Sequence, residues 1–106
     1  MNNNGFEIIS QETAKEIMSK PGDYVIVDVR NADEYADGHI ANAVLVPLPD
    51  LEQAAKEKLP DKEQLLLVYC RSGHRSKLAA ARLAELGYKN IKEFGGIIDW
   101  QWGIVK

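Results

Sequence analysis

The stretch "LLLVYCRSGHRSKLAAARLAELG", residues 65–87, decides the fold. Its first five residues form a continuous apolar run, which is typical of a strand that is buried on both faces. Residues 75–86 repeat apolar side chains with helical spacing, and Gly87 ends this predicted helix. A buried strand that leads directly into a helix is the basic unit of a parallel α/β sheet.

The rest of the chain repeats this alternation between short apolar runs and helical patterns. The apolar runs predict strands at 6–9, 24–29, 43–48, 65–69 and 91–94. The helical patterns and their capping residues predict further helices at 10–20, 31–38 and 50–59. We therefore expect an α/β fold with a central, mostly parallel five-stranded sheet flanked by helices on both faces.

The bulk composition indicates an ordinary globular protein. The 106 residues are 45% hydrophobic and 27% charged, which predicts one domain over 1–106 with a frayed start at 1–5. The net charge of −3 argues against a nucleic-acid binder, which needs a basic surface. No apolar run approaches the roughly 20 residues that span a bilayer, so we expect no membrane partner.

The single cysteine bears on both location and metal binding. One cysteine cannot form an intramolecular disulfide, which favours a reducing compartment, and the start "MNNNGFEIIS" lacks the pattern of a secretory signal. We take a cytoplasmic location as the default, although a signal removed from the chain would leave no trace. Cys70, His39 and His74 do not have metal-ligand spacing, so we expect no metal.

The segment "CRSGHR", residues 70–75, joins the predicted strand to the predicted helix. In an open α/β sheet, ligands bind beyond the carboxyl ends of the strands, and Cys70 lies at such an end. Gly73 supplies the positive φ that a sharp turn requires. The backbone N–H groups of the loop and of the first helical turn have no intrahelical partners, so they can converge on an anion.

Positive charge is concentrated around Cys70 in this acidic protein. Arg71, Arg75 and Lys77 follow it closely, and His74 adds charge when it is protonated. A helix N-terminus and nearby cations lower a cysteine pKa from about 8.5 to roughly 3.5–7.5, so we expect a reactive thiolate at the mouth of the fold. The competing interpretation is a small buried hydrophobic residue; the strand end, the glycine and the cations favour the reactive thiol.

A cysteine in such a loop suits two kinds of anion chemistry. Cysteine phosphatases carry a cysteine, five residues and then an arginine. Here Arg75 follows Cys70 after four residues, and position 76 is Ser76. The shorter loop makes a tighter cradle, which favours a terminal sulfur over a phosphate and disfavours a cysteine phosphatase or an arsenate reductase of related fold.

Three segments together resemble the rhodanese family, and specifically its small single-domain members, the thiosulfate sulfurtransferases. "VIVDVRNADEYADGHIANAVLVPL" at 25–48 resembles the first signature of the family, and "CRSGHRS" at 70–76 resembles its active loop. "FGGIIDW" at 94–100 resembles its C-terminal Gly-Gly…Trp signature. The segments lie in the order of the family, and the resemblance implies a rhodanese-like fold.

The resemblance also implies sulfur transfer in two steps. Cys70 would take the outer sulfur of thiosulfate or another small sulfur-containing anion as a persulfide, and a thiol, cyanide or protein acceptor would then remove it. It implies no cofactor. The alternative is a persulfide carrier or a regulatory module that acts on a partner protein.

Roles follow for individual residues. Cys70 is the expected nucleophile. The expected substrate-binding residues are those of the loop that follows it: Arg71, Ser72, Gly73, His74 and Arg75. Asp28 and Arg30 are expected to support the loop, with a structural ion pair as the competing interpretation. Other residues have structural expectations: Glu34 as a cap, His39 in a turn, and Trp100 and Trp102 as pocket walls or core anchors.

Overall fold

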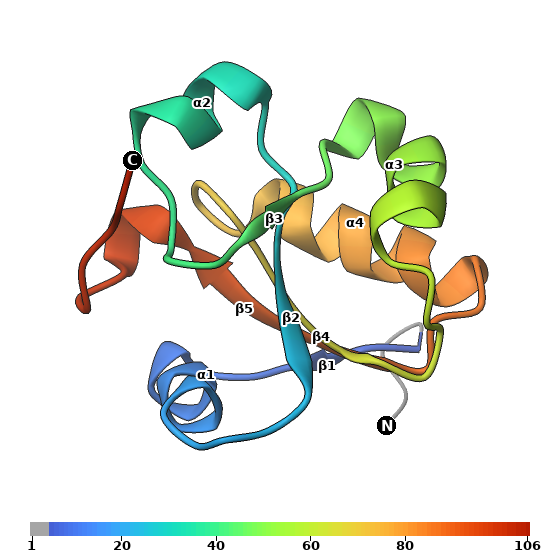
Figure 1. Cartoon of the computed structure of the whole chain (residues 1–106), viewed down its shortest axis with the longest axis horizontal. Helices are drawn as coiled ribbons and strands as arrows, with labels where there is room; N and C mark the ends of the chain where they lie inside the picture. Colours follow the sequence, from blue (N-terminus) through green and yellow to red (C-terminus); the bar gives the residue numbers. More distant parts are fainter. Residues whose placement is uncertain (1–4) are drawn as a thin grey trace.

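The protein is described by a computed structural model, in which residues 5–106 are placed (Figure 1). The expected fraying at 1–5 falls outside the described residues except for Gly5. Five strands pair in parallel in the order β1-β5-β4-β2-β3. They are β1 (Glu7–Ile8), β2 (Tyr24–Asp28), β3 (Val44–Leu45), β4 (Leu65–Cys70) and β5 (Asn90–Gly96). The expected five-stranded α/β sheet is confirmed.

Helices cover both faces of this sheet. The α-helices are α1 (Gln11–Met18), α2 (Ala32–Asp37), α3 (Leu51–Lys58) and α4 (His74–Glu85). Two 3-10 turns, η1 (Leu48–Asp50) and η2 (Ile97–Asp99), complete the elements. Figure 1 shows α3 and α4 together on one side of the sheet and α1 on the other. Among the residues that are placed, no helix combines the length and the apolar character needed to cross a bilayer.

The alternation of side chains along β4 separates two cores. Leu66, Val68 and Cys70 pack on the side of α3 and α4. Leu67 and Tyr69 pack on the opposite side, with α1. Successive strand residues point to opposite faces, so the Cys70 side chain is directed toward α4.

The expected elements differ from the observed ones by up to three residues at an end, and two of these differences matter for the site. The strand expected at 43–48 is limited to Val44–Leu45, because Pro47 cannot donate a ladder hydrogen bond and precedes the turn η1. The strand expected at 65–69 continues by one residue, so that Cys70 is the last residue of β4. Cys70 pairs with Gly96 of β5, so the loop that follows Cys70 begins beside the end of β5.

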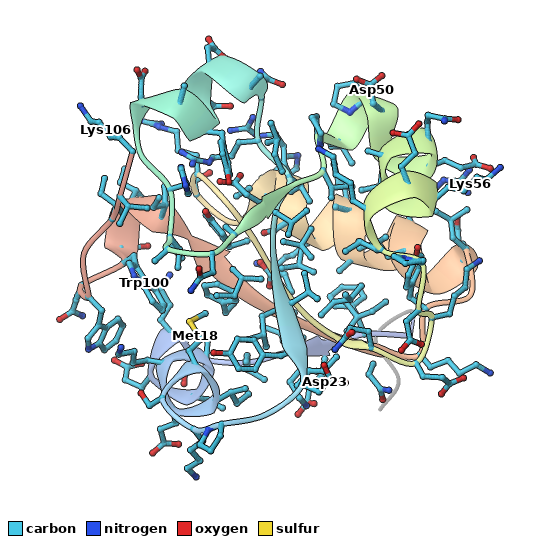
Figure 2. The ribbon with its side chains drawn as sticks, viewed as in Figure 1. Met18, Asp23, Asp50, Lys56, Trp100 and Lys106 are labelled. Carbon is cyan, nitrogen blue, oxygen red and sulfur yellow. The ribbon has the colours of Figure 1, made fainter. Side chains whose placement is uncertain are left out.

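The C-terminal segment closes the side of the sheet that α1 covers. The ring of Trp100 contacts Phe94 at 5.5 Å between centroids. Figure 2 shows Trp100 near Met18 of α1, and both pack against the same core. The tail then returns to α2, where Val105 and His39 exchange two backbone hydrogen bonds of 2.8 Å. Trp100 is thus a core anchor.

Candidate active site

Cys70 ends β4 beneath the loop that leads into α4. Its side chain is 1% exposed. The backbone N–H of Gly73 donates to Sγ at 3.0 Å, and Sγ lies 3.4 Å from Ser76 Oγ. The expectation of a thiol at the mouth of the fold is therefore wrong, because the loop folds over the sulfur. The groups that close around Sγ from the loop are polar, unlike the apolar side chains of the same core.

The pKa of the Cys70 thiol lies below its ordinary value. Burial on its own raises this pKa, but hydrogen bonds from the Ser76 side chain and from the amides of Ser76, Gly73 and Ser72 lower it by more. The direction agrees with the sequence prediction. The physical cause differs in part. The sequence prediction attributed the lowered pKa to the helix N-terminus and to nearby cations, whereas hydrogen bonds to Sγ are the main cause in the structure.

Two glycines from different elements shape the loop. Gly73 has φ +104°, a conformation that other residues rarely adopt, and it precedes the first turn of α4. A Cβ atom on Gly96 would lie 2.0 Å from the carbonyl oxygen of Arg71 and 2.5 Å from Cα of Ser72. The amide of Ile98 also donates to the Arg71 carbonyl at 3.1 Å. The Gly-Gly segment of β5 therefore lets the loop backbone pack directly against the sheet.

Arg75 is held by a carboxylate from α2. Its two terminal nitrogens donate to the two oxygens of Glu34 at 2.8 and 2.9 Å. Glu34 also accepts the amide of Asn31 at 3.0 Å, which is the capping contact that the sequence predicts. Hydrogen bonding to Arg75 is the main cause that lowers the pKa of Glu34 to about 2. The sequence did not indicate this pairing, which joins residues far apart in the chain.

The other polar residues of the loop lie at the surface. Arg71, Ser72 and His74 are exposed. Lys77 of α4 donates to the carbonyl of Gly73 at 3.2 Å. Within 5–106, Arg71 forms no ion pair, so its guanidinium is the one in the loop that is open to an incoming anion.

Asp28 and Arg30 form a buried ion pair on the side of Tyr69. Arg30 donates to both oxygens of Asp28, with the shortest contact at 2.7 Å, and also to the carbonyl of Gly38 at 2.7 Å. The Tyr69 hydroxyl donates to Asp28 at 2.7 Å and accepts the amide of Ile40 at 3.1 Å. This network connects the ends of β2 and β4 with the segment after α2. The ion pair of the competing interpretation is present, and it lies across the sheet from the Cys70 side chain.

Sequence reasoning did not assign two further polar residues to the site: Ser76, which contacts Cys70, and Glu93, which contacts Ser76. Ser76 and Glu93 are both fully buried, at 0% exposed. The Ser76 hydroxyl donates to Glu93 Oε2 at 2.5 Å, and the amide of Gly95 donates to the same oxygen at 2.9 Å. One feature of the sequence could have indicated Glu93. A carboxylate inside a short strand that is not at the edge of the sheet needs a buried hydrogen-bond partner.

The chemistry of the site centres on one thiol. No group of His, Cys, Asp or Glu side chains in the described part of the chain is placed to hold a metal ion. His39 lies outside the loop, where its ring stacks on Tyr35 at 3.8 Å between centroids. What the loop offers is a sulfur of lowered pKa, hydrogen-bond donors around it, and an exposed guanidinium nearby.

The chain is similar to several known proteins. The model of the rhodanese-like domain matches residues 10–101. The thiosulfate sulfurtransferase GlpE of Coxiella burnetii is 37% identical over 97 residues, which cover 91% of this chain and 88% of that protein. The putative sulfur carrier protein YrkF of Bacillus subtilis is 34% identical over 93 residues, 87% of this chain and 49% of that protein. A solved structure described as rhodanese with anions from E. coli superposes with a TM-score of 0.72 at 31% identity, covering 78% of this chain and 98% of that one.

Proposed function

The chain belongs to the rhodanese-like domain family, and on that basis we propose that Cys70 carries sulfane sulfur from a small anionic donor to an acceptor. Thiosulfate or a compound with a similar terminal sulfur is the donor. The observation that carries the proposal is the environment of Cys70, whose Sγ accepts a hydrogen bond from the Gly73 amide at 3.0 Å and whose pKa is lowered by the loop.

The first step is nucleophilic attack by the thiolate. Cys70 Sγ forms a bond to the outer sulfur of thiosulfate, the sulfur–sulfur bond of the donor breaks, and sulfite leaves with the bonding electrons. The product is a Cys70 persulfide with one negative charge on its terminal sulfur. In this proposal, the amides of Ser72 and Gly73 and the hydroxyl of Ser76, which lower the pKa of Sγ, also stabilise this charge.

The second step releases the sulfur. A thiolate, cyanide or a persulfide-accepting protein attacks the terminal sulfur, and the Cys70 thiolate is the leaving group. Arg71 is free to pair with the anionic end of the donor, while Arg75 can do so only if the donor replaces Glu34. Asp28 and Arg30 support the site electrostatically: after the hydrogen bonds between Glu34 and Arg75, which are the main cause, Asp28 contributes to the raised pKa of Arg75 and Arg30 to the lowered pKa of Glu34.

A sulfur carrier is the second candidate function. The relative YrkF, named a putative sulfur carrier protein, matches 87% of this chain. The burial of Cys70 also favours a persulfide that is protected until a specific partner docks. Turnover separates the two functions, because a carrier forms the persulfide but transfers it slowly to small acceptors.

Intact-mass measurement after thiosulfate treatment tests the proposal. We expect the protein to gain the mass of one sulfur atom, and we expect cyanide to remove it. Cys70→Ser, which keeps a polar side chain of similar size, should show no gain. If the wild-type protein gains no sulfur from thiosulfate or from an organic persulfide, the proposed function is wrong.

A further inference from the structure

We propose that Ser76 and Glu93 form a proton relay that takes the proton of the Cys70 thiol and keeps it on Glu93 while Cys70 carries sulfur. Only the persulfide stage of this inference rests on the proposed function. The movement of the proton is a property of the thiol and its neighbours, so it can be tested with reagents that transfer no sulfur.

The geometry gives the thiol proton one continuous path. Cys70, Ser76 and Glu93 are all buried, with exposed fractions of 1%, 0% and 0%. Sγ lies 3.4 Å from Ser76 Oγ, which lies 2.5 Å from Glu93 Oε2. Serine has one hydroxyl proton, and the short contact directs that proton to Glu93. A lone pair of the same oxygen is then free to accept the S–H of Cys70.

Proton transfer along this path balances without a co-reactant. The S–H bond of Cys70 breaks and an O–H bond forms at Ser76 Oγ. At the same time the original hydroxyl bond of Ser76 breaks and an O–H bond forms at Glu93 Oε2. The result is a thiolate that accepts from Ser76 and a carboxyl group that donates to Ser76. Each hydrogen bond reverses its direction, and the buried group keeps a single negative charge throughout.

The relay continues through the sulfur-transfer cycle. When the thiolate attacks the donor, its negative charge passes to the terminal sulfur of the persulfide, and Glu93 keeps the proton. When an acceptor removes that sulfur, the thiolate re-forms and the proton returns through Ser76 to Sγ. At no stage do the sulfur and Glu93 both carry a charge, which would place two anions in one buried site.

The groups around Glu93 come from several elements. Lys77 of α4 is the facing cation, with Nζ 3.4 Å from Oε1 and a side chain 48% exposed. Oε1 accepts no hydrogen bond from the described residues. Glu12 of α1 and Asp99 beside β5 line the cleft of about 360 Å³ that Glu93 and Lys77 border. The remaining contact, from the amide of Gly95 to Oε2, serves a carboxylate and a carboxyl group equally well.

The rate of Cys70 alkylation by iodoacetamide tests the relay directly. Glu93→Gln keeps the size of the side chain and can still accept from Ser76 and Gly95, but it cannot take a proton. We expect alkylation near neutral pH to slow by roughly 100-fold, the lower end of the effect of a positioned general base. The rate should then keep rising as the pH increases, because the thiol must lose its proton to water.

A purely structural or electrostatic role gives the opposite result. Removing a negative charge near a thiol favours the thiolate, so Glu93→Gln would then react as fast as the wild type or faster. That outcome would overturn the relay.

Ser76→Ala should slow the reaction as Glu93→Gln does, whereas Ser76→Thr keeps the hydroxyl and should restore most of the rate. Glu85→Gln makes the same chemical change at an exposed position of α4 and should leave the rate unchanged.

Infrared difference spectroscopy on the wild-type protein provides a second test, which does not depend on how the variants fold. Loading with thiosulfate should produce the carbonyl band of a protonated carboxyl group, and Glu93→Gln should lack that band. A loaded wild-type protein without the band would contradict the relay.

If thiosulfate adds no sulfur, the proposed function fails and the alkylation rates still decide the relay. If sulfur adds and Glu93→Gln alkylates at the wild-type rate, the relay fails and the proposed function stands.

Discussion

At the scale of single residues, the pKa of Cys70 is lowered by hydrogen bonds, and neighbouring charges are not among its main causes. The thiol is buried, which by itself raises its pKa, and the net lowering comes from the Ser76 side chain and the loop amides. Arg75 is paired with Glu34, so its charge is largely balanced. The exposed guanidinium of Arg71 acts through solvent, where charge interactions are screened.

A matched pair of substitutions separates these two contributions. Ser76→Ala removes a hydrogen bond to the thiolate and should raise the pKa of Cys70 by about one unit, since such bonds are worth roughly 1.5–3 kcal/mol. Arg71→Gln should change this pKa by less than about half a unit. Ultraviolet absorbance of the thiolate as a function of pH measures both. A larger shift in Arg71→Gln than in Ser76→Ala would show that cations dominate.

At the scale of elements, the loop depends on contacts with β5 and α2. Gly96 of β5 lies against the backbone of Arg71 and Ser72, where no side chain fits. Glu34 of α2 holds Arg75 in the first turn of α4. The loop around the sulfur is therefore held in place by residues of β5, α2 and α4, although the loop itself is one short stretch of sequence.

The close approach at Gly96 predicts a large effect of one methyl group. In Gly96→Ala the new Cβ would overlap the Arg71 carbonyl, so the loop or the strand must move. We expect the free energy of unfolding to fall by about 1–3 kcal/mol, as for other overpacked sites, and sulfur loading of Cys70 to fall with it. Gly22→Ala is the control, because nothing lies within 4 Å of its added Cβ and its stability should stay within about 0.5 kcal/mol. Equal stability of both variants in chemical denaturation would contradict this packing.

The Glu34–Arg75 pair predicts a stability that depends on acidic pH. The pKa of Glu34 falls from 4.5 to about 2 on folding, so the pair stabilises the fold above pH 4.5 and the contribution is lost as the pH falls to 2. Glu34→Gln should therefore lower the free energy of unfolding at pH 7 by roughly 1 kcal/mol or less, since the pair is partly exposed.

The difference between Glu34→Gln and the wild type should shrink between pH 4.5 and pH 2. Denaturation curves over this range, with Glu85→Gln as an exposed control, measure the effect. A difference that persists unchanged at pH 2 would indicate that Glu34 acts through packing and not through its charge.

At the scale of the whole molecule, the buried network of Asp28, Arg30 and Tyr69 connects parts of the chain that are distant in sequence. It joins the carboxyl ends of β2 and β4 to the segment that begins at Gly38. That segment is also held by the C-terminal tail through His39 and Val105. These contacts therefore hold the carboxyl end of β4, where Cys70 lies, from the face of the sheet opposite the Cys70 side chain.

Arg30→Met should destabilise the whole fold. The substitution leaves Asp28 buried without its cation, and losing one partner of a buried pair costs about 3–5 kcal/mol. Chemical denaturation should show the full loss, and the pKa of Cys70 in the folded variant should change little, because the pair lies across the sheet. Arg82→Met removes an exposed arginine of α4 and should cost less than about 1 kcal/mol. Similar stabilities for the two variants would show that the network does not stabilise the fold.

The sequence by itself determined the succession of strands and helices along the chain and the place of the loop that follows Cys70. Strand and helix patterns are local, so the alternation, the positive φ of Gly73 and the position of Cys70 at a strand end could all be read from nearby residues. The strand expected at 43–48 shows the limit of that reading, because Pro47 and the following turn shortened it.

Only the tertiary structure decided which side chains meet around the sulfur. Arg75 and Glu34 are 41 residues apart, and Ser76 and Glu93 are 17 apart. These pairs depend on the strand order and register of a parallel sheet, which are set by how the helices pack and not by any local pattern. For the same reason the burial of Cys70 could not be predicted, because the loop covers the sulfur only when β5 presents a glycine beside it.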